Sequence, residues 1–163
     1  MSRGAQVHHF GSKADLVVAA VKHLAARRAA AAVHDIAPIL AAGDDAVERA
    51  LDMLWDMHRG PLFVATMELW IASRTDRDLA RQVAQFEPVV TNALLGALAQ
   101  VVPAASIGKP TRDFVYLAMD AIRGILVADF VDQDSDRLDR RWRRAKRNLL
   151  DTAASLQIKL GTA

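Results

Sequence analysis

The sequence predicts an all-α fold, a bundle of six or seven helices. Apolar residues recur at helical spacing along almost the whole chain, and residues 25–32 are rich in alanine, which favours helix. No alternating run of β-branched residues lies between turn signals, so nothing predicts a strand. With 163 residues and 52% hydrophobic content, the chain can form one domain around a sizeable core and is not expected to be disordered.

The helix boundaries follow from capping residues, glycines and prolines. The first helix should begin at Ser12, whose hydroxyl can cap it. It should end before Pro38 or by Gly43, because proline disfavours helix in the preceding residue. The segment 62–73 is apolar nearly all round, which predicts a central, fully enclosed helix. The further helices are expected to run from Asp44 or Asp45 to Gly60-Pro61, and over 62–73, 78–101, 111–131 and 135–160.

Composition excludes several classes of protein. The chain has no cysteine, which rules out disulfide frameworks, thiolate catalysis and cysteine metal sites and suits a reducing cytoplasm. No apolar run reaches the roughly 18–20 residues of a spanning helix, and the first residues lack an apolar signal region. We therefore expect a cytoplasmic protein with no membrane partner. The formal net charge of +2 is too small to indicate nucleic-acid binding by itself.

The most specific pattern lies in the first 24 residues. A short run of small residues leads into His9-Phe10, Gly11, Ser12-Lys13 and Leu16, just where the first helix is expected to start. This pattern resembles the end of the helix-turn-helix in transcriptional regulators of the TetR/AcrR family. A weaker resemblance, to the effector domain of one TetR subgroup, runs from Leu54 to Asp76.

The resemblance implies a set of DNA contacts. Arg3 and Gln6 would read base edges, since arginine suits guanine and glutamine suits adenine. His8, His9 and Lys13 would meet phosphates, beside the backbone amides at the start of the following helix. For one of the two histidines, packing is the alternative role.

Two departures from the family pattern bear on this expectation. Val7 stands where the family usually has tyrosine. The chain also begins inside the helix-turn-helix, through trimming or through a valine codon read as the start at Met1, so we expect that it does not bind an operator specifically by itself. The resemblance divides the chain into a helix-turn-helix remnant at 1–11, a connecting helix at 12–43, and an effector-binding and dimerisation domain at 44–163.

The resemblance implies a ligand-responsive transcriptional regulator. TetR-type proteins bind palindromic operators as homodimers and release them when a small molecule enters the effector domain. The expected partners are therefore operator DNA, a second copy of the chain and a small, mostly apolar effector. No residues converge on chemistry and no phosphate loop occurs, so neither an enzyme nor a cofactor is expected. The alternative is a helical dimeric module that binds a ligand or protein and has no role at DNA.

The effector cavity is expected among large apolar side chains with few polar groups. Methionines and aromatic residues at helical spacing are usually core, but in this fold some of them would line the cavity. Glu68 and Arg123 each stand in an otherwise apolar helix, and enclosed charges need partners, so we expect them to pair. The residues predicted to line the cavity are Trp55, Phe63, Met67, Glu68, Trp70 and Arg123.

The last two helices are expected to form a four-helix bundle with their copies around a two-fold axis. Each carries a continuous apolar stripe at spacings of three and four, which suits near-parallel helix packing. The alternative is that both stripes face the chain's own helices and the protein is a monomer. The residues assigned to the dimer interface are Phe114, Leu117, Ala121, Ile125, Leu138, Trp142, Ala145, Leu149 and Leu156.

Two further patterns have competing interpretations. Six of the 21 basic residues lie from Arg140 to Arg147, but on an amphipathic helix they form a solvated or ion-paired face more readily than a DNA contact. Asp52, Asp56 and His58 resemble part of a metal site. No second set of ligands accompanies them, so a solvated helix face is favoured and no metal is predicted.

Overall fold

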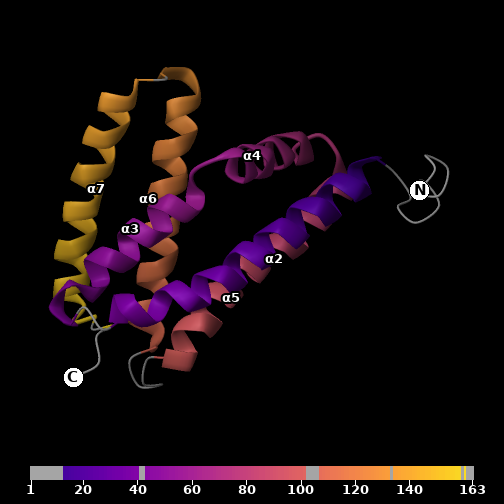
Figure 1. Ribbon diagram of the computed structural model, residues 1–163. Coiled ribbons are helices and arrows are strands. Elements are labelled where there is room, and N and C mark those ends of the chain that lie inside the picture. Colours follow the sequence, from indigo (N-terminus) through magenta and orange to yellow (C-terminus); the bar gives the residue numbers. More distant parts are fainter. Residues whose placement is uncertain (1–12, 41–42, 102–106, 133, 159, 161–163) are drawn as a thin grey trace.

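The computed structural model describes residues 13–40, 43–101, 107–132, 134–158 and 160 (Figure 1). Within these ranges every regular element is a helix, which confirms the predicted all-α class. None of the described helices is both long and apolar enough to cross a membrane. The elements are α2 (Lys13–Leu40), the 3₁₀ helix η1 (Gly43–Asp45), α3 (Ala46–His58), α4 (Pro61–Ser73), α5 (Arg77–Val101), α6 (Lys109–Asp132) and α7 (Ser135–Ser155).

A long helix pair forms one part of the molecule. α2 and α5 lie side by side, and α4 lies against both of them (Figure 1). The side-chain amide of Gln82 donates a hydrogen bond to the Asp15 carboxylate, which ties the start of α5 to the start of α2. Val21 of α2 is buried beneath α4, where Leu62 and Leu69 pack against it. α4 is therefore coupled directly to α2.

A three-helix group forms the other part. α6 and α7 run side by side as a hairpin, and α3 packs against both (Figure 1). Asp134 caps α7, because its carboxylate accepts a hydrogen bond from the Arg137 backbone N–H at 3.1 Å. Leu51, Met119 and Ile122 are the largest side chains that are fully buried, and they mark the centre of this core. Each contributes roughly 1.5–3 kcal/mol through burial.

Glycine and proline set the helix ends mostly as predicted. Gly60 has a φ of 110°, which favours glycine, and Pro61 takes the first position of α4, where its missing N–H costs no hydrogen bond. Pro38 lies inside α2, in its last turn, so the expected end before Pro38 is wrong, whereas an end by Gly43 is confirmed. A proline so near the helix end disturbs few intrahelical hydrogen bonds.

α7 ends at Ser155 and does not continue to Leu160 as predicted. Gln157 adopts the left-handed backbone conformation (φ 54°), and the Ile158 N–H donates to the Ala153 carbonyl at 2.9 Å. This is the Schellman arrangement of a helix C-terminus, in which glycine usually takes the left-handed position. It turns the chain back, so that Ile158 and Leu160 are buried in the core.

α4 is not the central, fully enclosed helix that its composition predicts. Phe63 and Met67 are buried, but Val64 and Ile71 are 40% and 59% exposed. The helix packs against α2 and α5 and reaches α6 through Trp70. The rest of its surface has no cover from the described part of this chain. α4 is therefore covered on the faces toward α2, α5 and α6 and open on the remaining face.

Candidate functional site

Two side-chain contacts join α4 to α6. Near the start of α4, the rings of Phe63 and Phe130 lie with their centroids 6.1 Å apart. Two turns further along α4, the Arg123 guanidinium carbon lies 5.2 Å from the centre of the Trp70 ring. Helical spacing puts Phe63 and Trp70 on one face of α4, with the buried Met67 between them. We call Phe63, Trp70, Arg123 and Phe130 the α4–α6 contact.

The indole nitrogen of Trp70 is the unusual atom of this contact. It is buried from solvent and has no hydrogen-bond partner among the residues that the structure describes. A buried donor without an acceptor costs about 1–3 kcal/mol, and around 90% or more of buried polar groups in proteins have a partner. The α4–α6 contact therefore holds an unsatisfied donor.

The Arg123 side chain places a positive charge over the same indole. It is only 14% exposed, and its Nη1 forms an ion pair with Asp120 Oδ1 at 3.4 Å, one turn earlier on α6. Arginine stays protonated even when buried, and a guanidinium over an aromatic face is attracted by about 0.5–2 kcal/mol. Cation and donor thus stand next to each other between α4 and α6.

Glu68 lies outside the α4–α6 contact. Its side chain is exposed, because Phe63, Met67 and Trp70 take the inward face of α4 and position 68 falls on another face. The expected pairing of Glu68 with Arg123 is not formed, since the ion pair of Arg123 is with Asp120 on its own helix.

Trp55 belongs to a second aromatic contact, between α3 and α7. Its ring stacks on Trp142 with a centroid distance of 4.6 Å and an interplanar angle of 5°, and both residues are buried. The Arg59 guanidinium carbon lies 5.7 Å from the Trp55 ring centre. The six predicted cavity residues therefore divide between the α3–α7 stack, the α4–α6 contact and, for Glu68, the surface.

A lysine strengthens the joint between α3 and α7. Lys146 Nζ lies 2.9 Å from a Glu48 oxygen and 3.0 Å from an Asp52 oxygen. Partial burial lowers the pKa of Lys146, but hydrogen bonds to the two carboxylates outweigh burial and raise the pKa above its ordinary value of 10.5. Asp52 thus forms an ion pair with Lys146. The Nδ1 of His58 contacts the Leu54 carbonyl at 2.7 Å, so both residues take part in contacts that hold the fold together.

A small apolar cavity of about 30 Å³ lies between α3, α6 and the C-terminal segment. Its size suits a single water molecule, and apolar cavities of this size usually stay dry. None of the six predicted cavity residues lines it. Its walls are Val47, Ala50, Leu51, Met53, Leu54, Thr111, Phe114, Val115, Ile158 and Leu160.

Much of the expected dimer interface is occupied within the chain. Phe114, Leu138, Trp142 and Leu149 are buried in the core, where they meet α3 and its neighbours. Ala121, Ile125 and Ala145 are partly buried against the same core. Leu117 and Leu156 are exposed. The apolar side chains that α6 leaves exposed are Tyr116, Leu117, Val127, Phe130 and Val131, and Val131 is 92% exposed.

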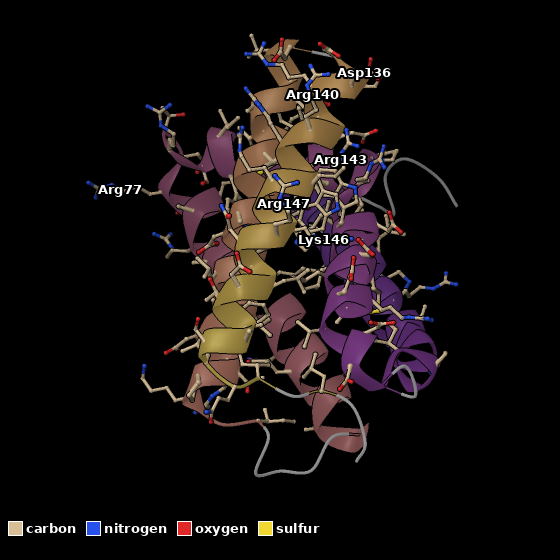
Figure 2. The ribbon with its side chains drawn as sticks, turned by 90° about the vertical axis from the view of Figure 1, so that its left-hand side faces the viewer. Arg77, Asp136, Arg140, Arg143, Lys146 and Arg147 are labelled. Atoms are coloured by element: carbon tan, nitrogen blue, oxygen red, sulfur yellow. The ribbon has the colours of Figure 1, made fainter. Side chains whose placement is uncertain are left out.

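The outer face of α7 is basic. Arg140, Arg143 and Arg147 are exposed along it at spacings of three and four, whereas Lys146 lies on the side toward α3 (Figure 2). Arg141, from the same block, approaches Asp132 at 3.9 Å. The block therefore combines ion-paired residues with an exposed arginine row, as expected for an amphipathic helix.

The predicted DNA contacts fall mostly outside the described residues. Arg3, Gln6, His8 and His9 lie there, and Lys13 is the first residue of α2.

Other residues of the two contacts escaped prediction. The spacing of three between Asp120 and Arg123 is a signal that could have indicated their ion pair. The partners Phe130 and Glu48 carry no local signal, because α4 and α7 bring these contacts together from distant parts of the sequence.

One curated protein that the chain resembles is the HTH-type transcriptional regulator CymR of Pseudomonas putida. The two sequences are 28% identical over 149 residues, which cover 86% of this chain and 69% of CymR. No family model matches the chain, and no solved structure matches it. The similarity to CymR supports a role in transcription regulation in general, and CymR is named as a regulator, not as an enzyme.

Proposed function

We propose that this chain is the effector-binding and dimerisation part of a TetR-type transcriptional repressor. The observation that carries the proposal is the similarity to a helix-turn-helix regulator over 86% of the chain. The all-helical architecture agrees with it. The His9-Phe10 pattern and Lys13 would belong to the DNA-binding end, and residues 44–163 would bind the effector.

Contacts between helices suggest how an effector acts at a distance. α4 touches α6 through the α4–α6 contact and α2 through Val21, Leu62 and Leu69. A ligand between α4 and α6 would move α4, and α4 would carry α2 with it. α2 would follow the DNA-binding helices along the chain. Its movement would therefore shift the population of dimers toward a spacing of the two DNA-binding heads that no longer fits two successive major grooves.

The homodimer would form through the outer faces of α6 and α7. The exposed face of α6 carries Leu117, Val127 and Val131 together with the acidic Asp120, and that of α7 carries the arginine row. Two-fold pairing of α6 with α7 of the second copy would cover the apolar side chains with arginine stems and set acidic against basic groups. Such an interface should bury on the order of 2,000 Å² in total.

Chromatin immunoprecipitation of the tagged chromosomal protein, from the cells that encode it, tests the regulator. We expect a few enriched sites that share one palindromic motif near promoters. Absence of any enriched site would favour the alternative, a helical binding module without a role at DNA.

Light scattering tests the dimer. At micromolar concentration we expect twice the 17.8 kDa of one chain. The double variant Leu117→Arg with Val131→Arg should fall to the single-chain mass, because the added cations would face the arginine row of the second copy and repel it. Ile71→Arg, on the exposed side of α4, is the matched control and should stay dimeric. A single-chain mass for the unaltered protein would end the dimer proposal.

A further inference from the structure

We propose that the α4–α6 contact binds a small organic anion, whose carboxylate meets the Arg123 guanidinium and the Trp70 indole N–H. The inference rests on the proposed function, because it names the chemical class of the effector. Apolar residues in the sequence predict a mostly apolar effector. The structure adds a cation and an unsatisfied donor side by side, and these call for a negatively charged acceptor.

The indole N–H argues for an acceptor. Trp70 Nε1 is buried and has no partner among the described residues, so the protein bears the cost of a lost hydrogen bond in this state. A ligand oxygen that reaches Nε1 would remove this cost. A purely apolar ligand would leave Trp70 unsatisfied, so the site should discriminate against it.

The guanidinium argues for a negative charge on that acceptor. Arg123 is mostly buried, and its contact with Asp120 is long, at 3.4 Å from Nη1, with the Asp120 side chain 72% exposed. A guanidinium has five N–H donors in a planar fork, so it can hold a ligand carboxylate as well as its present partners. Hydrogen bonds to charged groups in a poorly solvated site are stronger than neutral ones.

The surrounding side chains argue for an aromatic or similarly flat apolar body. Met67 lies one turn from Trp70 on the same face of α4, and the contact between Phe63 and Phe130 extends this apolar strip by a further turn. Methionine adapts readily to the shape of a ligand. One face of α4 stays open, with Val64 and Ile71 exposed, and a small shift of α4 away from α6 would admit a ligand. Benzoate is the simplest molecule that combines these features.

Indole NMR signals give a direct test on the 163-residue chain. The three tryptophans produce three indole ¹H–¹⁵N signals, and the Trp70→Phe variant identifies the one from Trp70. We expect saturable benzoate binding that moves the Trp70 signal downfield. Benzamide, which has the same ring and no charge, should bind at least tenfold more weakly, since losing one charge-assisted hydrogen bond costs a factor of roughly 10–100.

Two variants test separately the two protein groups that would hold the ligand carboxylate. Arg123→Gln should weaken benzoate binding roughly 10–100-fold, and Trp70→Phe about tenfold, because each removes one donor from the carboxylate. Arg112→Gln is the matched control, since it removes an exposed arginine from the same helix, three turns away, and should leave the affinity unchanged. Circular dichroism would show that all three variants remain helical.

Three results would overturn the site: no saturable binding of benzoate at millimolar concentration, an unmoved Trp70 signal, or equal affinity in Arg123→Gln. The proposed function fails in a different way. If benzoate binds as described but the chromosomal protein enriches no DNA, the anion site stands and the regulator does not. If the protein enriches an operator and only neutral molecules release it, the regulator stands and the anion site does not.

Discussion

The α3–α7 stack and the α4–α6 contact are both built on tryptophan, but they leave their polar groups in different states. At the α3–α7 stack, Trp55 and Trp142 lie flat against each other and Lys146 meets two carboxylates. At the α4–α6 contact, the Trp70 nitrogen is buried beneath a cation and has no partner among the described residues. The polar groups of the α3–α7 stack are satisfied by other residues of the chain, whereas the described part of the chain offers no acceptor to Trp70.

This difference separates a structural region from a functional one. Stability is concentrated where packing and polar groups are satisfied together, and binding sites often keep groups that only a ligand satisfies. Tryptophan is central to both regions, so the difference arises from the side chains that pack against it and not from the residue type. Four substitutions probe this difference, and their expected effects on stability range from about 5 kcal/mol to less than about 0.5 kcal/mol.

Trp142→Ala should destabilise the protein most. Removing a buried indole that stacks on Trp55 leaves a large cavity between α3 and α7, and such changes cost about 3–5 kcal/mol. Chemical denaturation followed by circular dichroism measures the loss. A cost below about 1 kcal/mol would show that the α3–α7 stack is not the stable region.

Lys146→Met should cost about 1 kcal/mol at neutral pH, because it keeps the apolar stem and removes the charge that meets Glu48 and Asp52. The pKa of Lys146 is raised in the folded state, so its contribution is fully present below about pH 10.5 and is lost as pH rises through the higher folded value. The free energies of unfolding of the variant and the unaltered protein should therefore differ at pH 8 and converge at strongly alkaline pH. A constant difference across this range contradicts the assignment.

Gln157→Gly should stabilise the same region slightly, by about 0.5 kcal/mol. Gln157 holds a left-handed backbone conformation that glycine adopts without strain, although glycine also loses more freedom on folding. The melting temperature is the readout, and the neighbouring exposed position serves as control through Leu156→Gly, which should lower it. A lower melting temperature for Gln157→Gly would mean that the turn after α7 is held by its side chain.

Trp70→Phe should change the free energy of unfolding least, by less than about 0.5 kcal/mol. The smaller ring loses packing, but the substitution also removes a buried donor that has no partner, and the two effects oppose each other. The contrast with Trp142→Ala is not size-matched, so Trp142→Phe is the proper comparison and should cost more than Trp70→Phe. If Trp70→Phe costs more than Trp142→Phe, the tryptophan that stabilises the fold is Trp70, between α4 and α6.

Sequence patterns located the helices well because local signals set their ends. Gly60 and Pro61 divide α3 from α4 as predicted, whereas the continuation of α2 past Pro38 and the turn at Gln157, where glycine would be usual, were missed. Which face of a helix turns inward was harder to predict. α4 is apolar nearly all round, so composition could not indicate that Glu68 and Ile71 face outward.

The candidate site was predicted in part for the same reason. Phe63, Trp70 and Arg123 were expected near one another, and α4 and α6 bring Trp70 against Arg123, while Phe63 meets Phe130 two turns away. Trp55 was expected with them but packs on Trp142, because α7 covers α3. Partner choice of this kind depends on contacts between residues more than fifty positions apart, which a helical period does not encode.

Release of DNA tests the central claim most directly. An operator recovered by chromatin immunoprecipitation can be labelled and its binding to the chromosomal form of the protein followed by fluorescence anisotropy as benzoate is added. The account predicts that benzoate releases the unaltered protein, while Arg123→Gln binds the operator equally well and is released only at roughly 10–100-fold higher benzoate. Equal release of both proteins, or no release of either, would contradict it.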